Sequence, residues 1–123
     1  MMYVMIAIGG ALGALSRYGA TKWINSHWHS SFPMATLSIN VLGSVLMGVA
    51  FVIIMERMPA LVPYRPLVMV GFLGAFTTFS TFSLEIVALI NMQAWLSAIS
   101  YLLLSCILGI AGLAAGMAMA RLF

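Results

Sequence analysis

Charged residues are scarce in this sequence. Only 6% of its 123 residues are Asp, Glu, Lys or Arg, and only two of these are acidic. Soluble globular domains carry about 25% charged residues, so the composition excludes that class of protein. The chain also has a single cysteine, Cys106, which excludes a disulfide framework and a multi-cysteine metal site within one chain.

Apolar residues take the place of the missing charges. They make up 64% of the chain, and they form four runs long enough for membrane-spanning helices, which need about 20 residues each. We therefore predict an all-α polytopic membrane protein in which residues 1–123 form a single transmembrane domain. The four predicted spans are approximately residues 2–24, 32–55, 67–90 and 94–122.

Basic residues are shared almost evenly between the two ends of these spans. Four spans place Arg57, Arg65 and Arg121 on one side of the membrane, and Lys22 with Arg17 on the other. The asymmetry of lysine and arginine near span ends sets the direction of insertion. Because the asymmetry is small here, the chain is able to insert in either direction, which permits an antiparallel homodimer.

The third run contains the most unusual segment, Gly74 to Ser83, which reads GAFTTFSTFS. Glycine next to threonines of weak helix propensity predicts a helix break near residues 74–78. A break frees backbone carbonyls at mid-membrane, where such groups coordinate a small cation such as Na⁺. The alternative is a continuous helix whose hydroxyls bond back to carbonyls one turn earlier.

Two aromatic rings follow the predicted break. Phe79, Phe82 and Glu85 recur at intervals of three and fall near one helical face, with Ser80 and Ser83 beside them. The edge of an aromatic ring carries the positive part of its quadrupole, so rings presented edge-on attract a small anion. The alternative is that both phenylalanines are ordinary core residues.

Other polar side chains lie inside the remaining spans. Asn40 is the only amide in the apolar part of any span, and it needs a partner because an unpaired buried amide costs about 1–3 kcal/mol. That partner is either another helix or a permeating anion, to which the NH₂ group would donate. Tyr101 and Ser105, one turn apart in the last span, form a short hydroxyl track.

Small residues and one arginine mark the faces along which helices meet. Gly9, Gly13 and Arg17 share one face of the first span, and further glycines line the last span. These faces serve either a dimer contact or packing within the chain. Arg17 either extends its side chain to the membrane surface or concentrates anions at a vestibule.

Taken together, three motifs closely resemble those of the Fluc family of fluoride channels, also called CrcB. They are GAFTTFSTFSLE in the third span, PMATLSIN from Pro33 to Asn40, and the early glycines that lead into Ser16, Arg17 and Tyr18. The likeness covers the whole chain, including its length and its four spans. It implies a dual-topology, antiparallel homodimer with two fluoride pores, in a membrane that we expect to be the bacterial inner membrane.

The resemblance also implies roles for particular residues. Phe79 and Phe82 would line the fluoride path, Asn40 would help to carry the ion, and Gly74 and Thr77 would offer carbonyls to a central structural Na⁺. Gly109 falls where some members have a hydroxyl, so that end of the track departs from the pattern. The residues expected along the fluoride pathway are Arg17, Asn40, Phe79, Ser80, Thr81, Phe82, Ser83, Glu85, Tyr101 and Ser105.

From these observations we predict a passive channel that exports cytoplasmic fluoride and catalyses no reaction, so it is not an enzyme. Its expected partners are fluoride, a second copy of the chain and the lipid bilayer, with no nucleic acid. One alternative is a proton-coupled exporter of the small multidrug type that uses Glu85. Another is a non-transporting membrane assembly subunit held together by its glycine faces.

Overall fold

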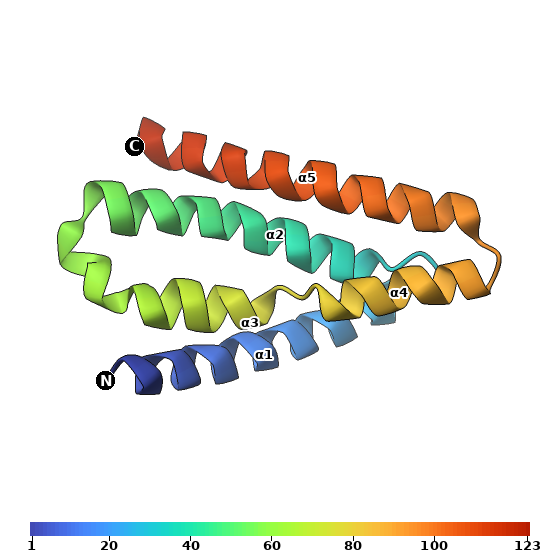
Figure 1. Cartoon of the computed structure of the whole chain (residues 1–123), viewed down its shortest axis with the longest axis horizontal. Helices are drawn as coiled ribbons and strands as arrows, with labels where there is room; N and C mark the ends of the chain where they lie inside the picture. The colour runs from blue at the N-terminus through green and yellow to red at the C-terminus, as the bar shows by residue number, and fades with distance from the viewer.

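The computed structural model describes all residues from 1 to 123 and consists of helices and short connections. η1 continues α2, and η3, α3 and α4 follow one another, so the elements group into four long rods that lie side by side (Figure 1). Both termini lie at the same end of the bundle. The predicted all-α class is confirmed. In chain order the elements are α1 (Met2–His27), α2 (Met34–Phe51), η1 (Val52–Arg57), η2 (Pro59–Tyr64), η3 (Pro66–Leu73), α3 (Gly74–Phe76), α4 (Ser80–Asn91) and α5 (Trp95–Leu122).

Three of the rods are long and apolar enough to cross a membrane, namely Met34–Arg57, Pro66–Asn91 and Trp95–Leu122. They coincide closely with the second, third and fourth predicted spans. The first rod, α1, is 26 residues long, about 39 Å at 1.5 Å per residue, but it is not among the three. Only 18 of 123 residues are buried, so most apolar side chains face outward. The chain is a multi-pass membrane protein.

Glycines bring the rods together in pairs, α1 against η3 and α2 against α5. A Cβ atom on Gly13 would collide with the carbonyl oxygen of Phe72, and one on Gly116 would collide with that of Val45. Only glycine permits so close an approach between helix backbones. Of the two roles predicted for these glycine faces, the structure therefore shows packing within the chain.

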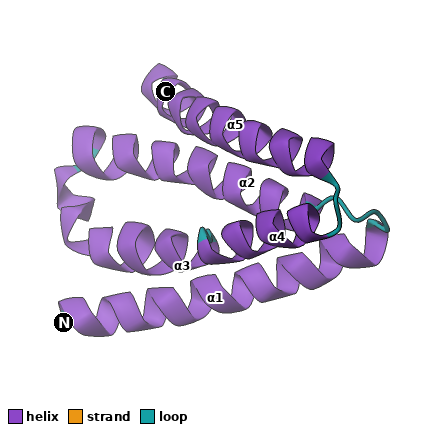
Figure 2. Ribbon diagram, turned by 45° about the vertical axis from the view of Figure 1, so that its right-hand side comes forward, coloured by secondary structure: helices purple, strands orange, loops and turns teal.

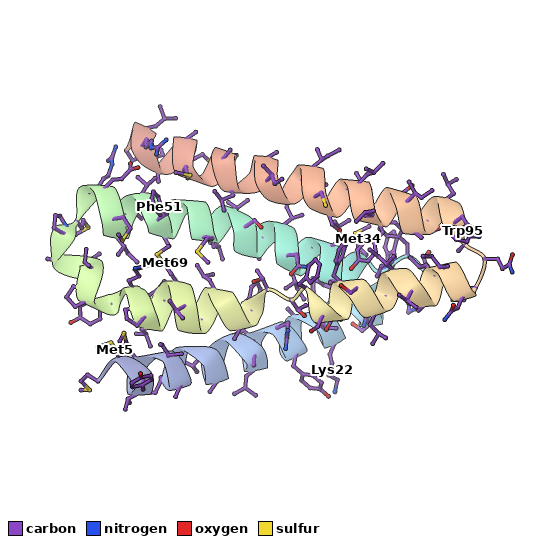
Figure 3. All side chains as sticks on the ribbon, viewed as in Figure 1. Met5, Lys22, Met34, Phe51, Met69 and Trp95 are labelled. Atoms are coloured by element: carbon purple, nitrogen blue, oxygen red, sulfur yellow. The ribbon has the colours of Figure 1, made fainter.

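The connections between the rods are short (Figure 2). A tight turn joins α4 to α5, and Gln93 takes a positive φ of 61° there. At the opposite end, the proline-rich segment between α2 and η3 forms η2. Met5, Phe51 and Met69 lie toward the end of the bundle that holds both termini, whereas Lys22, Met34 and Trp95 lie toward the other (Figure 3).

The buried core lies off-centre, near the end of the bundle where α4 meets α5. Its aromatic members are Phe82 and Tyr101, whose rings meet edge to face at 5.0 Å between centroids. The ring of Phe32 also meets that of Tyr101 edge to face, at 5.6 Å between centroids. This cluster holds α2, α4 and α5 in register next to the interruption of the third rod. The buried members of the cluster are Leu37, Phe82, Leu89, Ala98 and Tyr101.

Candidate functional site: a broken helix at mid-span

The third rod is interrupted at residues 77–79 (Figures 1 and 2). α3 ends at Phe76, Thr77 is extended with ψ of 157°, and α4 begins at Ser80. The sequence predicted this break slightly too early. Gly74 stays helical with φ of −62°, and the chain leaves the helix only at Thr77, a β-branched residue that loses little by adopting the extended conformation.

Hydroxyl groups bond back to the main chain on both sides of the break. Thr77 Oγ1 donates to the carbonyl of Leu73 at 3.0 Å, and Ser83 Oγ donates to that of Phe79 at 3.0 Å. From the sequence alone, a broken helix and a continuous helix with back-bonded hydroxyls were alternatives. The structure contains both features, because the back-bonded hydroxyls lie at the two helix ends and Thr77 is extended where the helix opens.

Asn40 of α2 pairs with the backbone of the break. Its Nδ2 donates to the carbonyl oxygen of Thr78 at 2.9 Å, and its Oδ1 accepts the Thr78 N–H at 2.8 Å. One side-chain amide thus replaces both backbone partners that Thr78 loses when the helix opens. Because an NH₂ group carries two hydrogens, one N–H of Asn40 is left for a further acceptor.

The break also leaves main-chain oxygens without helical partners. The N–H groups of Thr77, Thr78 and Phe79 do not reach the carbonyl of Gly74, and no backbone N–H reaches the carbonyl of Thr77. Carbonyl oxygens are ligands for hard cations, as in other membrane ion sites. The donor set at Gly74 and Thr77 therefore fits a small cation such as Na⁺.

A pocket of about 340 Å³ opens beside the break, between α2 and α5. Gly43 of α2 faces this region, and a Cβ there would lie 3.3 Å from the ring of Phe76 and would collide with the Thr77 methyl group. A glycine is required here because α2 and the break approach so closely. The pocket is lined by Asn40, Gly43, Ser44, Met47, Thr77, Thr78, Phe79 and Leu113.

The two phenylalanines after the break have different surroundings. Phe79 is 78% exposed, whereas Phe82 is 7% exposed and packs on Tyr101. Their rings nevertheless lie together, with centroids 5.7 Å apart and planes tilted by 43°. Phe82 is thus a core residue that also contacts Phe79. Most of the Phe79 side chain is not covered by the rest of this chain. Ser80 and Thr81 are likewise exposed.

Polar groups continue from the break toward the α4–α5 end of the bundle. Thr36 Oγ1 donates to Glu85 Oε1 at 2.5 Å. The Tyr101 hydroxyl lies close to Thr36 and Glu85. The Ser105 hydroxyl is buried and has no hydrogen-bond partner in the protein, which leaves it as a donor for a ligand. Thr36 was missing from the predicted set, although its position one turn before Asn40 on the same face of α2 could have indicated it.

Arg17 lies on the other side of the break, in a smaller pocket of about 190 Å³. Four threonine side chains from three different rods share this pocket with the guanidinium group. The first predicted span therefore does contribute a cation to the region of the break. The pocket is lined by Ala14, Arg17, Tyr18, Thr21, Thr36, Ile39, Thr78 and Thr81.

Known proteins resemble this chain over most of its length. Residues 4–117 match the family model described as CrcB-like protein, Camphor Resistance (CrcB). Two similar proteins, each named fluoride-specific ion channel FluC, come from Hahella chejuensis (47% identity, covering 97% of this chain and 94% of the relative) and from Magnetococcus marinus (40% identity, covering 99% of both). A third with the same name, from Saccharophagus degradans, is 47% identical and covers 89% of this chain and 82% of the relative. The chain belongs to the CrcB-like family.

Proposed function

We propose that this protein is a fluoride-specific passive ion channel that lets cytoplasmic fluoride leave the cell. The observation that carries the proposal is the near full-length similarity to proteins named fluoride-specific ion channels, combined with a helix broken at mid-span beside unpaired donors. The channel only lowers a barrier to diffusion, so it catalyses no chemical reaction.

In the membrane, we propose a single transmembrane domain of four spans, in which α1 joins the three rods that are long and apolar enough to cross a membrane. The organisms of the similar proteins favour the bacterial inner membrane. The balance of basic residues at the two ends supports insertion in both directions. Each orientation would then supply one subunit of an antiparallel homodimer.

The exposed surface at the break supports this dimer. Phe79, Ser80 and Thr81 are exposed in the single chain at about the middle of the third rod, and lipid offers hydroxyls no hydrogen-bond partner. A second, antiparallel copy would cover this surface and would bring its own Phe79 next to the first pore. The dimer would thus form two pores, each lined by both subunits.

A sodium ion at the centre of this dimer fits the carbonyl oxygens of Gly74 and Thr77. Two subunits related by a two-fold axis would present these oxygens in pairs. The ion would supply a positive charge at mid-membrane, next to the two anion pathways. Asn40 would keep this site open. Its two hydrogen bonds hold Thr78 outside the helix, so that the neighbouring carbonyls stay free of helical hydrogen bonds.

The fluoride pathway that we propose runs along the polar groups on either side of the break. Fluoride is small and accepts strong hydrogen bonds. In a narrow path, the free N–H of Asn40, hydroxyls and ring edges therefore replace the water molecules that the ion loses and offset the free energy of its dehydration. Chloride is larger and accepts weaker hydrogen bonds, so the same path returns less of its hydration energy. The proposed pathway residues are Arg17, Thr36, Asn40, Phe79, Ser80, Thr81, Phe82, Ser83, Glu85, Tyr101 and Ser105.

Efflux from liposomes tests this function. Purified protein reconstituted into vesicles loaded with potassium fluoride should release fluoride to an electrode once a potassium ionophore is added, and the rate should not change with an imposed pH gradient. Vesicles loaded with chloride should retain it. No release of fluoride would refute the channel, and a requirement for a pH gradient would favour a proton-coupled exporter that uses Glu85.

A further inference from the structure

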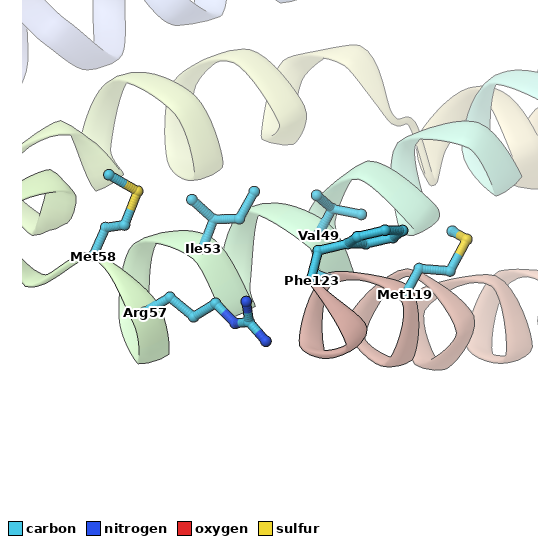
Figure 4. Close-up of a pocket in the computed structure, with 7 residues that line it drawn as sticks. Val49, Ile53, Arg57, Met58, Met119 and Phe123 are labelled. Atoms are coloured by element: carbon cyan, nitrogen blue, oxygen red, sulfur yellow. The ribbon is translucent and has the colours of Figure 1, made fainter.

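An apolar groove lies away from the break, where η1 and the last turns of α5 run side by side (Figure 4). It has a volume of about 840 Å³, and six of its seven lining residues are hydrophobic. Figure 4 shows Ile53 and Arg57 projecting from neighbouring turns, with Phe123 and Met119 on the facing helix. The lining residues are Val49, Ile53, Arg57, Met58, Met119, Ala120 and Phe123.

The rim of this groove carries an arginine, Arg57, that forms no ion pair with an acidic side chain. Arg121 forms a two-point ion pair with Glu56, at 2.7 and 3.1 Å. Arg57 Nη2 donates to the main-chain carbonyl of Arg121, which holds the guanidinium group at the groove without cancelling its charge. Glu85, the only other acidic side chain of the protein, pairs with Thr36 instead.

The position of the groove along the spans defines the kind of molecule that fits it. Arg57 is the last residue of the span Met34–Arg57, which is the level of the lipid headgroups. Ile53 and Val49 lie one and two turns deeper, about 6 and 12 Å toward the hydrocarbon at 1.5 Å per residue. The groove therefore runs from a positive charge at headgroup depth to an apolar surface at acyl-chain depth.

We propose that this groove binds one anionic phospholipid, with its phosphate on the Arg57 guanidinium and an acyl chain along Val49, Ile53 and Met119. Basic pockets between membrane helices bind anionic headgroups in this way. Phosphate accepts hydrogen bonds from two guanidinium N–H groups at once, and the apolar wall anchors the chain. The site lies about 20 Å along the helix from Asn40 at 1.5 Å per residue, and it stands whether or not the protein conducts fluoride.

Native mass spectrometry of the detergent-purified protein with added lipid tests the proposal. Phosphatidylglycerol should bind more tightly than phosphatidylcholine of the same acyl chains. Arg57→Gln should weaken phosphatidylglycerol binding about five-fold, the value of one basic residue near the headgroups. Arg65→Gln is the matched control, because it removes the same charge at the same end from a residue outside the groove, and it should leave binding within the error of the wild type.

Two further variants separate the site from folding effects and from other occupants. Arg57→Lys keeps the charge and should retain most of the preference for phosphatidylglycerol. Met119→Trp fills the groove from an exposed position and should weaken the binding of both lipids. Excess inorganic phosphate should displace neither lipid from the wild type. Equal binding of the two lipids to the wild type, or equal losses in Arg57→Gln and Arg65→Gln, would overturn the proposal. A shift by Met119→Trp from dimer to monomer without loss of lipid would assign the groove to a second copy instead.

Discussion

The pairing of Asn40 with Thr78 makes the sharpest prediction about what holds the third rod open. Asn40→Ala removes two hydrogen bonds of 2.9 and 2.8 Å and leaves the carbonyl and the N–H of Thr78 without partners. An unpaired buried polar group costs about 1–3 kcal/mol. Because both residues are half-buried, we take the lower value for each group and expect a loss of about 2 kcal/mol in the free energy of unfolding.

A loss of this size corresponds to about a 30-fold change in an equilibrium constant. It should appear as earlier unfolding of Asn40→Ala in a titration with sodium dodecyl sulfate followed by far-UV circular dichroism. Fluoride efflux from liposomes should fall as well, because the path loses one donor and the geometry of the break.

Ser44→Ala is the matched control for this variant. Ser44 lies one turn further on α2, and its hydroxyl only bonds back to the carbonyl of Asn40, at 2.8 Å. Its removal should change stability by less than about 1 kcal/mol. If Asn40→Ala lowered efflux but unfolded at the wild-type detergent concentration, Asn40 would act on the ion alone, and the proposed structural role would be refuted.

Three other changes test separate parts of the structure. Gly13→Ala should destabilise the fold by about 1–3 kcal/mol, because its Cβ would collide with a backbone carbonyl. Gly10→Ala should not, because nothing lies within 4 Å of its Cβ. If both variants unfolded at the same detergent concentration, the packing of α1 against η3 would be contradicted. Phe79→Ile should slow fluoride efflux and spare the fold of the chain, while Phe82→Ile, at a buried ring, should lower both efflux and stability; normal efflux in both variants would exclude an aromatic lining. Purification and assay with N-methylglucamine in place of sodium should reduce efflux, and an unchanged rate would argue against a functional sodium ion.

The sequence was most informative about the third rod. Glycine next to threonines in an apolar run predicted a break, because these residues have weak helix propensity. The break begins at Thr77 rather than at Gly74, since the glycine keeps a helical φ of −62°. Composition indicates where a helix is weak, but the tertiary contacts select the residue at which it opens.

The hydrogen bonds between residues far apart in the chain were not predicted from the sequence. The bonds between Asn40 and Thr78 join residues in different rods, and the residue pattern of one sequence does not reveal which helices are neighbours. For the same reason, the bond from Thr36 to Glu85 was not predicted. The glycine faces were recognised, but only the contacts of Gly13 with Phe72 and of Gly116 with Val45 showed that they pack within the chain.

The most direct test of the central claim is the anion selectivity of the purified protein in a planar lipid bilayer. With fluoride on one side and chloride on the other, the reversal potential should follow the fluoride gradient, and no current should flow when chloride is the only anion. A reversal potential set by chloride, or by protons, would contradict a fluoride-specific path along the broken third helix.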